Sequence, residues 1–454
     1  MSMVKLSPTR GLPRPDRAVG RRVEERVKPF VRWGLGHGLP RLVIRKADRK
    51  DDLQGRLIMT STGSHTFDVV PHFDELRRRG PVVKGAFSYM SGSHPLVRDV
   101  LGGSDFRTGI GTGAGGWTDR LYGWAATELF SPVEPPSLLV TEPPDHTRYR
   151  KLVTRVFTAR AVEGLRERAQ QVADELLDAI DPRDPVDLVE AYCGLLPVTV
   201  ISEILGVPTA ERTRILELGA GAAASLDLGL SWRQFRDVEA SLHEFDAWLT
   251  DHLEDLRRQP GDNLLSQLIA VRDEEGGLSE LELKATAGLV LAAGFETTVN
   301  LLSNGIALLC EHPDQLALLR ERPELWGNAV DEALRFDPPV LLTGRVAERE
   351  TELAGVRIPA GAVVTTVLAA ANRDPDVFAD PGRFDVTREN ARDHVSFSSG
   401  RHYCLGASLA RMEGEIGLRT LFDRFPDLAL RPGATRRPTR ILRGYETLPA
   451  SLRG

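Results

Sequence analysis

The residues best suited to chemistry lie in two separate stretches, and the first of them surrounds a cysteine. Cys404 is one of three cysteines in the chain, and it lies between Gly400 and Gly406, just before a helical pattern that begins at Ala407. A thiolate near a helix start receives the positive end of the helix dipole and free backbone N–H groups, which lower its pKa and suit it to bind a metal. A lone cysteine is also often only a small buried hydrophobic residue, so this position alone does not decide between the two.

The second stretch is polar and lies in the middle of an apolar helical pattern. Ser279 and Glu282 have the spacing of a capping box, and the helix that they predict runs to Glu311 before Pro313. Its centre carries Glu296 and two threonines among apolar residues, and such local conflicts concentrate at working sites. The alternative is that the Thr297 hydroxyl bonds to the carbonyl of residue 293 and that Glu296 reaches solvent.

Both stretches resemble motifs of the cytochrome P450 superfamily. Residues 397–411 resemble its haem-binding loop, with Ser398 where the pattern usually has glycine, and residues 293–298 resemble its oxygen-activation motif. The resemblance implies that Cys404 is the proximal ligand of a haem b iron, with open access for O2 on the other face. The loop residues that match, and so are expected to bind the cofactor, are Phe397, Gly400, His402, Cys404 and Gly406.

The same resemblance gives roles to the helix centre. Small Ala293 and Gly294 would leave room for O2, the Thr297 hydroxyl would hydrogen-bond to oxygen during its activation, and Glu296 would relay protons. The expected apolar substrate pocket is formed by Leu289, Ala292, Ala293, Leu341 and Leu342.

Other matches concern the haem propionates and the support under the haem. His146 and Arg150 are four apart on one helix face, which alone indicates a solvated face, but with Arg345 and His402 they match propionate-binding positions. Glu332 and Arg335 have the spacing of an exposed ion pair, and together with Arg383 they match a buried structural network of the family.

Composition limits the class of protein. The 454 residues carry a net charge of −6, which points to no nucleic-acid partner, and no run of eighteen apolar residues predicts a membrane span. Cysteines at scattered positions fit a reducing cytoplasm. Residues 1–60 are basic and are expected to form an extension. Within them, residues 21–34 set apolar residues at helical spacing, so they either pack on the parent domain or contact anionic lipid at the membrane surface.

We therefore predict a mainly α-helical, single large P450-type fold with small β-sheets and a long central helix over the haem. The boundaries are a basic extension at 1–60 and a haem-thiolate monooxygenase domain at 61–454. Residues 26–57 and the sequence Ala-Gly-Phe-Glu-Thr-Thr-Val-Asn are similar to the bacterial family numbered one hundred and forty. The expected reaction is C–H hydroxylation or epoxidation of an apolar organic substrate.

Electrons are expected to come from NAD(P)H through a ferredoxin reductase and a ferredoxin, which would dock on the basic face of Arg148, Lys151 and Arg155. One alternative is a peroxide-driven relative, which Glu296 and Thr297 argue against. Another is a non-catalytic haem sensor, or a zinc site formed by Cys404, His402 and His394.

Overall fold

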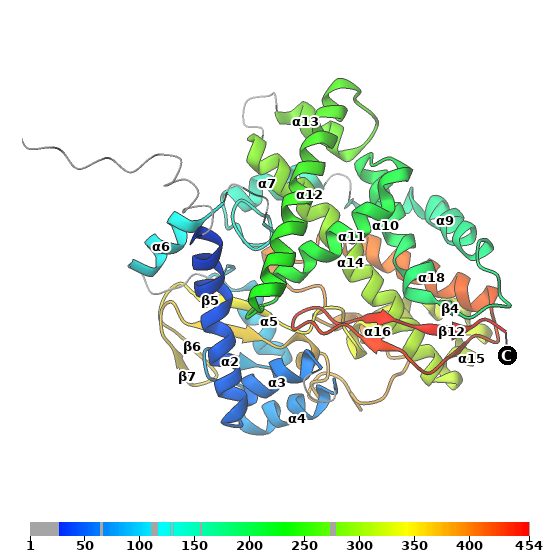
Figure 1. Cartoon of the computed structure of the whole chain (residues 1–454). Coiled ribbons are helices and arrows are strands. Elements are labelled where there is room, and N and C mark those ends of the chain that lie inside the picture. The colour runs from blue at the N-terminus through cyan, green and yellow to red at the C-terminus, as the bar shows by residue number, and fades with distance from the viewer. Residues whose placement is uncertain are drawn as a thin grey trace, which may run out of the picture.

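The central element of the fold is the long helix α14, Glu280–Glu311, which crosses the middle of the molecule (Figure 1). The computed structural model describes residues 27–63, 67–109, 117–127, 129, 131–154, 157–272 and 278–453. At 1.5 Å per residue the helix is about 48 Å long. The Ser279 Oγ accepts from the Glu282 N–H at 3.3 Å, and the Glu282 carboxylate accepts from the Ser279 N–H at 2.7 Å. The predicted capping box and both ends of the helix are confirmed.

The other helices surround α14. Those before it are α2 Leu39–Arg49, α3 Leu53–Ser61, α4 Val70–Arg79, α5 His94–Gly102, α6 Trp117–Ala125, α7 Asp145–Thr154, α8 Ala159–Glu163, α9 Arg166–Asp178, α10 Leu195–Leu205, α11 Arg212–Ala223, α12 Trp232–Arg258 and α13 Leu264–Arg272. Those after it are α15 Pro313–Glu321, α16 Trp326–Phe336, α17 Leu368–Ala371 and α18 Ala407–Arg424.

The strands are short and form small sheets. They are β1 Val83–Lys84, β2 Tyr89–Ser91, β3 Phe106–Arg107, β4 Val186–Asp187, β5 Thr343–Ala347, β6 Thr351–Leu353, β7 Val356–Ile358, β8 Val363–Thr366, β9 Ala429–Leu430, β10 Thr435–Arg436, β11 Tyr445–Thr447 and β12 Pro449–Ser451. The largest sheet has the order β1-β2-β8-β5-β3, in which β2 and β8 are parallel and the other pairs are antiparallel. The prediction of a mainly α-helical fold with small sheets is confirmed.

The N-terminal helices belong to the packed body. Residues 27–33 form a helix that continues through a π-helical turn, Gly34–Gly38, into α2. The Trp33 indole donates to the carbonyl of Leu230 at 3.1 Å. Leu53 and Leu57 of α3 are buried in one apolar cluster with Phe73. The packing is therefore continuous across residue 60, because Leu53 and Leu57 before it share a cluster with Phe73 after it.

The apolar centre of α14 is covered by other helices. By length and composition α14 is able to span a membrane, but 78% of its most apolar window is buried inside the protein. Contacts with α10, α11, α16 and α18 account for much of this burial. The helix therefore has the surroundings of a core helix.

Candidate active site

The cysteine loop is shaped by two residues with positive φ. Ser398 has φ 64° and Gly400 has φ 67°, a conformation that favours glycine. At Gly400 a Cβ atom would also lie 2.6 Å from the Cα of Gly102, so glycine is required there for close packing on α5. Ser398 adopts the same conformation with a side chain, which accounts for the family's preference for glycine at that position. The Cys404 N–H then donates to the carbonyl of Phe397 at 2.9 Å and closes the loop.

The Cys404 side chain is accessible to solvent although protein surrounds it on most sides. Burial raises the pKa of its thiol above the ordinary value, while the N–H of Gly406 and the charges of Arg150 and Arg411 act in the opposite direction. The expectation of a lowered pKa is therefore wrong for the free thiol. Helix α18 begins three residues later, with Gly406 as its N-cap, so only the nearest N–H group acts on the sulfur.

The centre of α14 exposes one narrow stripe. Between Ala285 and Leu309 every residue is buried except Leu289, Ala293, Gly294 and Thr297. Leu289, Ala293 and Thr297 follow one another at intervals of four and therefore share one face of the helix. Ala293 is the most accessible of them, which is unusual for a small residue in a core helix. The stripe therefore faces space that the protein's own side chains do not fill.

The polar residues of the stripe are partly engaged. The Thr297 hydroxyl donates to the carbonyl of Ala293 at 3.1 Å, as the simpler alternative for this residue predicts. The hydroxyl still accepts hydrogen bonds through its lone pairs. A Cβ atom at Gly294 would lie 2.8 Å from Ile201 Cγ1, so this glycine allows α10 to pack closely. The structure therefore gives Gly294 a packing role, and the room for O2 beside it stays a prediction.

Glu296 does not reach solvent. Its side chain is 3% exposed, and Oε1 forms an ion pair with Arg437 from the C-terminal segment. Oε2 is buried and has no hydrogen-bond partner in the described part of the chain. Burial raises the pKa of this carboxyl, and Arg437 opposes that effect. Glu296 is therefore a buried, partly satisfied carboxyl group next to the accessible face.

Four predicted propionate-binding residues lie near one another. The rings of His146 and His402 have centroids 4.3 Å apart, and the Arg150 guanidinium donates to the carbonyl of Tyr403 at 2.7 Å. Arg345 is buried and acts electrostatically on His402. Nε2 of both histidines is buried without a hydrogen-bond acceptor among the described residues. This group of cationic and donor side chains is suited to hold carboxylates.

Burial controls the ionisation of these groups. Desolvation lowers the pKa of His146, and desolvation with His146 and Arg345 lowers the pKa of His402 to about 4. Burial likewise lowers the pKa of Arg345 to about 10. At neutral pH the imidazoles are therefore neutral and the guanidinium is charged, so the site provides both positive charge and uncharged donors.

One carboxylate already lies in this group, and the sequence analysis did not select it. Glu142 Oε2 is 2.8 Å from Arg401 Nε, and Oε1 is 3.5 Å from Nε2 of His402. Glu142 also accepts from the hydroxyl of Thr108 at 2.9 Å. Its position four residues before His146 is the only sequence signal that could have indicated it. Arg401 lies beside the matched loop residues, but its type alone does not predict this pairing.

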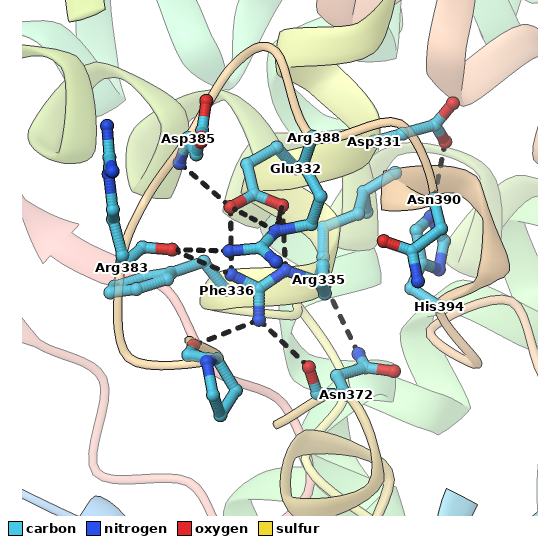
Figure 2. A network of polar contacts seen from close by, with 12 residues as sticks. Asp331, Glu332, Arg335, Phe336, Asn372, Arg383, Asp385, Arg388, Asn390 and His394 are labelled. Atoms are coloured by element: carbon cyan, nitrogen blue, oxygen red, sulfur yellow. Dashed lines mark hydrogen bonds and ion pairs between the residues drawn. The ribbon is translucent and has the colours of Figure 1, made fainter. Parts of the chain in front are cut away.

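The structural network below the loop differs from the prediction in one arginine. Arg335 Nε is 2.7 Å from Glu332 Oε2, and both side chains are fully buried, as predicted (Figure 2). The second arginine is Arg388, whose Nε is 3.1 Å from the same oxygen. Arg383 is exposed, and Figure 2 shows its side chain pointing away from the carboxylate.

The reason for this difference is the path of the chain between residues 380 and 388. The carbonyl of Arg383 accepts from Arg335 at 3.1 Å and from Arg388 at 3.0 Å, so the backbone of Arg383 takes part while its side chain turns outward. The prediction of Arg383 as a side-chain member of the network is therefore wrong.

The remaining predicted residues are those of the substrate pocket and of the alternative zinc site. Ala292 and Leu341 are 5% and 3% exposed and belong to apolar clusters, so they are core residues. Leu342 is half-buried, like Leu289. Both ring nitrogens of His394 form hydrogen bonds. Nδ1 accepts from the N–H of Ser396 at 3.1 Å, and Nε2 lies 3.2 Å from Asp331 Oδ1. His394 therefore has no free nitrogen for the alternative zinc site.

The basic face of α7 is only partly free. Arg148 Nη2 lies 2.7 Å from Glu282 Oε1, and the Tyr149 hydroxyl donates to the same oxygen at 2.6 Å. Although burial acts to raise it, these hydrogen bonds lower the pKa of Glu282 to about 2. Lys151 is exposed, and Arg155 lies outside the described residues.

Comparison with known proteins identifies the class that this fold and site define. Residues 198–441 match the family model described as Cytochrome P450. The chain is 51% identical, over 94% of its length and 98% of the relative, to "Putative cytochrome P450 140" of Mycobacterium tuberculosis. It is 44% identical to the 6-deoxyerythronolide B hydroxylase of Saccharopolyspora erythraea over 69% of this chain and 77% of that one.

A solved structure agrees with these relatives. The crystal structure of CYP164A2 from Mycobacterium smegmatis matches with a TM-score of 0.78 and 32% identity, covering 88% of this chain and 99% of that one. The chain belongs to the cytochrome P450 family, and the predicted similarity to the family numbered one hundred and forty is confirmed. It is a cytochrome P450 monooxygenase that uses haem b and O2, with reducing equivalents from NAD(P)H through redox partners.

The residues of this chain fit haem b. The accessible thiol of Cys404 provides a ligand for iron, and the Nε2 atoms of His146 and His402, which make no hydrogen bond within the described residues, suit the two propionate groups. Arg345 contributes buried positive charge to the same group. The accessible stripe of α14 provides an apolar face with a single hydroxyl.

Proposed function

We propose that this monooxygenase hydroxylates or epoxidises an apolar organic substrate on the stripe of Leu289, Ala293 and Thr297. The observation that carries the proposal is that these residues are accessible in a helix whose other central residues are buried. An apolar wall with one hydroxyl suits a carbon skeleton held for oxidation at one position. Leu342, which is half-buried, is a further candidate for the pocket wall.

The residues of the chain divide the work as follows. Haem b, bound through Cys404, supplies the redox chemistry that activates O2. Because the Thr297 hydroxyl donates to the Ala293 carbonyl, its lone pairs remain available to hold a water molecule by accepting a hydrogen bond from it. Glu296 has a pKa raised by burial, so it exchanges a proton nearer to neutral pH than an exposed glutamate does.

Arg437 controls the position of that carboxyl. Its guanidinium pairs with Glu296 Oε1 and also donates to the carbonyl of Tyr445 at 3.2 Å, so the C-terminal segment holds the acid in place. The free oxygen, Oε2, is the atom that we assign to proton transfer, because it has no partner in the described residues.

The test of this proposal is a coupling measurement. Thr297→Ala is expected to keep substrate-induced spectral changes and to consume NAD(P)H while forming less product, with Thr297→Ser as the matched control that retains the hydroxyl. Unchanged coupling in Thr297→Ala would remove the residue from the mechanism. Product formation with hydrogen peroxide alone, at the rate of the complete electron-transfer system, would favour the peroxide-driven alternative.

The same face and one relative support the substrate class that we propose. The hydroxylase of Saccharopolyspora erythraea is named for 6-deoxyerythronolide B. We propose an apolar substrate of comparable kind for this chain, because the accessible residues near Thr297 are small or aliphatic. Titration with steroids, fatty acids, terpenes and polyketides, followed by the haem spin-state change, identifies the substrate class that binds.

We propose a ferredoxin as the electron donor, docking near α7 and the cysteine loop in the cytoplasm. Lys151 is exposed, and Arg148, although paired with Glu282, keeps a third of its side chain accessible. An acidic ferredoxin is attracted to such a face, and the attraction weakens with salt. Lys151→Glu is expected to slow reduction at low ionic strength, while Lys50→Glu, directly after the end of α2, serves as the control.

The proposed lipid contact of residues 21–34 is restricted to part of that range. Residues 21–26 lie outside the described part, and Trp33 packs inward. Val27 and Phe30 are exposed by 40% and 57%. These two side chains support a peripheral contact, which sedimentation with anionic vesicles tests.

A further inference from the structure

A basic pocket lies where three distant parts of the chain meet. Its volume is about 200 Å³, and it is bordered by Arg41 and Arg45 of α2, by Asp227 in the segment before α12, and by Arg440 near the C-terminus. In Figure 1, α2 lies in the left part of the molecule, next to α3. Guanidinium groups offer several N–H donors in a fixed plane, which suits the oxygens of phosphate or carboxylate groups.

The positive charges of this pocket are not balanced by the acid beside them. Asp227 Oδ1 accepts the backbone N–H groups of Arg440 at 2.9 Å and Ile441 at 3.2 Å, and Oδ2 accepts that of Arg440 at 3.1 Å. The lining therefore holds three guanidinium groups and one carboxylate, and this carboxylate is already engaged by the backbone. Within the described residues Arg45 has no ion-pair partner.

Arg440 leaves a donor unused. One of its terminal nitrogens donates to the carbonyl of Leu228, but its Nε is buried without an acceptor among the described residues. Arg41 donates to the carbonyl of Gly229 at 3.0 Å. A buried N–H group without a partner is unfavourable, so an acceptor at this place would stabilise the protein.

The arginines also act on one another. Burial and then the charge of Arg45 lower the pKa of Arg41. Burial lowers the pKa of Arg440, Asp227 opposes this effect, and Arg41 and Arg45 add to it. An anion between the three side chains would replace repulsion with attraction.

We propose that this pocket binds a phosphate group, held by Arg45, Arg41 and the free Nε of Arg440. Binding would join α2, the loop before α12 and the C-terminal segment through one ligand. The carbonyl of Ile441 accepts the N–H of Leu341 at 2.8 Å, so the ligand site is connected to the strand region beside the proposed substrate pocket. This inference concerns a site separate from the haem and is independent of the proposed reaction.

Two sources provide the same phosphate chemistry. One is a soluble phosphate ester or inorganic phosphate, and the other is the headgroup of an anionic lipid. The second source is physically reasonable because Leu39 and Leu42 of α2 are 56% and 64% exposed on the outer face of the same helix. The experiment therefore uses one probe for each source.

The test compares the haem-loaded wild-type protein with Arg45→Gln, Arg440→Gln and the control Arg49→Gln. Arg45 and Arg49 are both exposed on α2, but only Arg45 lines the pocket, so the two variants differ in one feature. The measurements are thermal unfolding and calorimetric titration with inorganic phosphate, against sodium chloride at equal ionic strength. The second arm is sedimentation with vesicles that contain phosphatidic acid or only phosphatidylcholine.

Phosphate is expected to raise the unfolding temperature of wild type and Arg49→Gln, and affinity should fall at least about tenfold in Arg45→Gln, because a charge-assisted hydrogen bond is lost. The lipid source is supported if wild type binds phosphatidic acid vesicles but not free phosphate, and if Arg45→Gln loses the vesicle binding that Arg49→Gln keeps. Binding in neither arm, or equal binding by Arg45→Gln and Arg49→Gln, overturns the proposal. If Arg440→Gln does not fold, the Arg45→Gln comparison still decides the outcome.

Discussion

Replacing Arg388 tests the corrected network below the cysteine loop. Glu332 is fully buried, and the guanidinium of Arg388 contributes one of its two arginine partners. Arg388 also donates to the carbonyls of Ala379 at 2.6 Å and Arg383 at 3.0 Å. Arg388→Met keeps much of the apolar stem but removes all of these bonds, so a buried carboxylate and several carbonyls lose a partner.

The size of the effect can be worked out. Removing one partner of a buried ion pair costs about 3–5 kcal/mol. Unfolding entropy is about 2.1 cal/mol/K per residue, so for 454 residues it is roughly 0.95 kcal/mol/K. Arg388→Met should therefore lower the unfolding temperature by about 3–5 °C. Arg383→Met is the matched control, and it should change the temperature by less than about 0.5 °C, because the Arg383 side chain is exposed.

Thermal unfolding of the haem-loaded proteins, followed by far-ultraviolet circular dichroism and by the haem absorbance, measures both variants. Equal destabilisation by Arg383→Met and Arg388→Met would contradict the assignment. A larger effect of Arg383→Met would restore the prediction made from the motif.

The remaining predictions concern the cysteine loop and the start of α14. Gly400→Ala should destabilise the protein and reduce haem retention, because its Cβ would lie 2.6 Å from the Gly102 Cα and its φ is 67°; wild-type haem content after gel filtration would contradict this. Glu282→Gln keeps the capping side chain but removes a charge whose pKa is lowered to about 2. Because the folded pKa lies below the ordinary value of 4.5, the stabilisation is present above about pH 4.5 and is lost as pH falls toward 2. The difference in unfolding temperature between wild type and Glu282→Gln should therefore shrink below about pH 4.5, and a difference that is constant with pH would argue against the ion pair.

Local signals allowed the long helix and the loop to be predicted. The capping box at Ser279 and Glu282 sets the start of α14, and Pro313 follows its end, so both boundaries can be predicted from neighbouring residues. The position of Cys404 before α18 follows in the same way from Gly406 and the helical pattern after it.

Long-range pairings were not predictable from local signals. Arg437 lies far from Glu296 in sequence, and nothing in its neighbourhood indicates a buried carboxylate partner. Arg383 and Arg388 both follow Pro381, and only the backbone path decides which side chain turns inward. Leu53 and Leu57 lie in a region of basic composition, yet they pack into the core. The net charge of a segment does not indicate which face of its helices is buried.

The most direct test of the account is the absorption spectrum of the reduced carbon monoxide complex of wild type and Cys404→Ser, with Cys310→Ser as the control. The account predicts the strongly red-shifted band of thiolate-ligated haem in wild type and in Cys310→Ser, and its loss in Cys404→Ser. Retention of that band in Cys404→Ser, or a wild-type protein that takes up no haem, would contradict the assignment of Cys404 as the iron ligand.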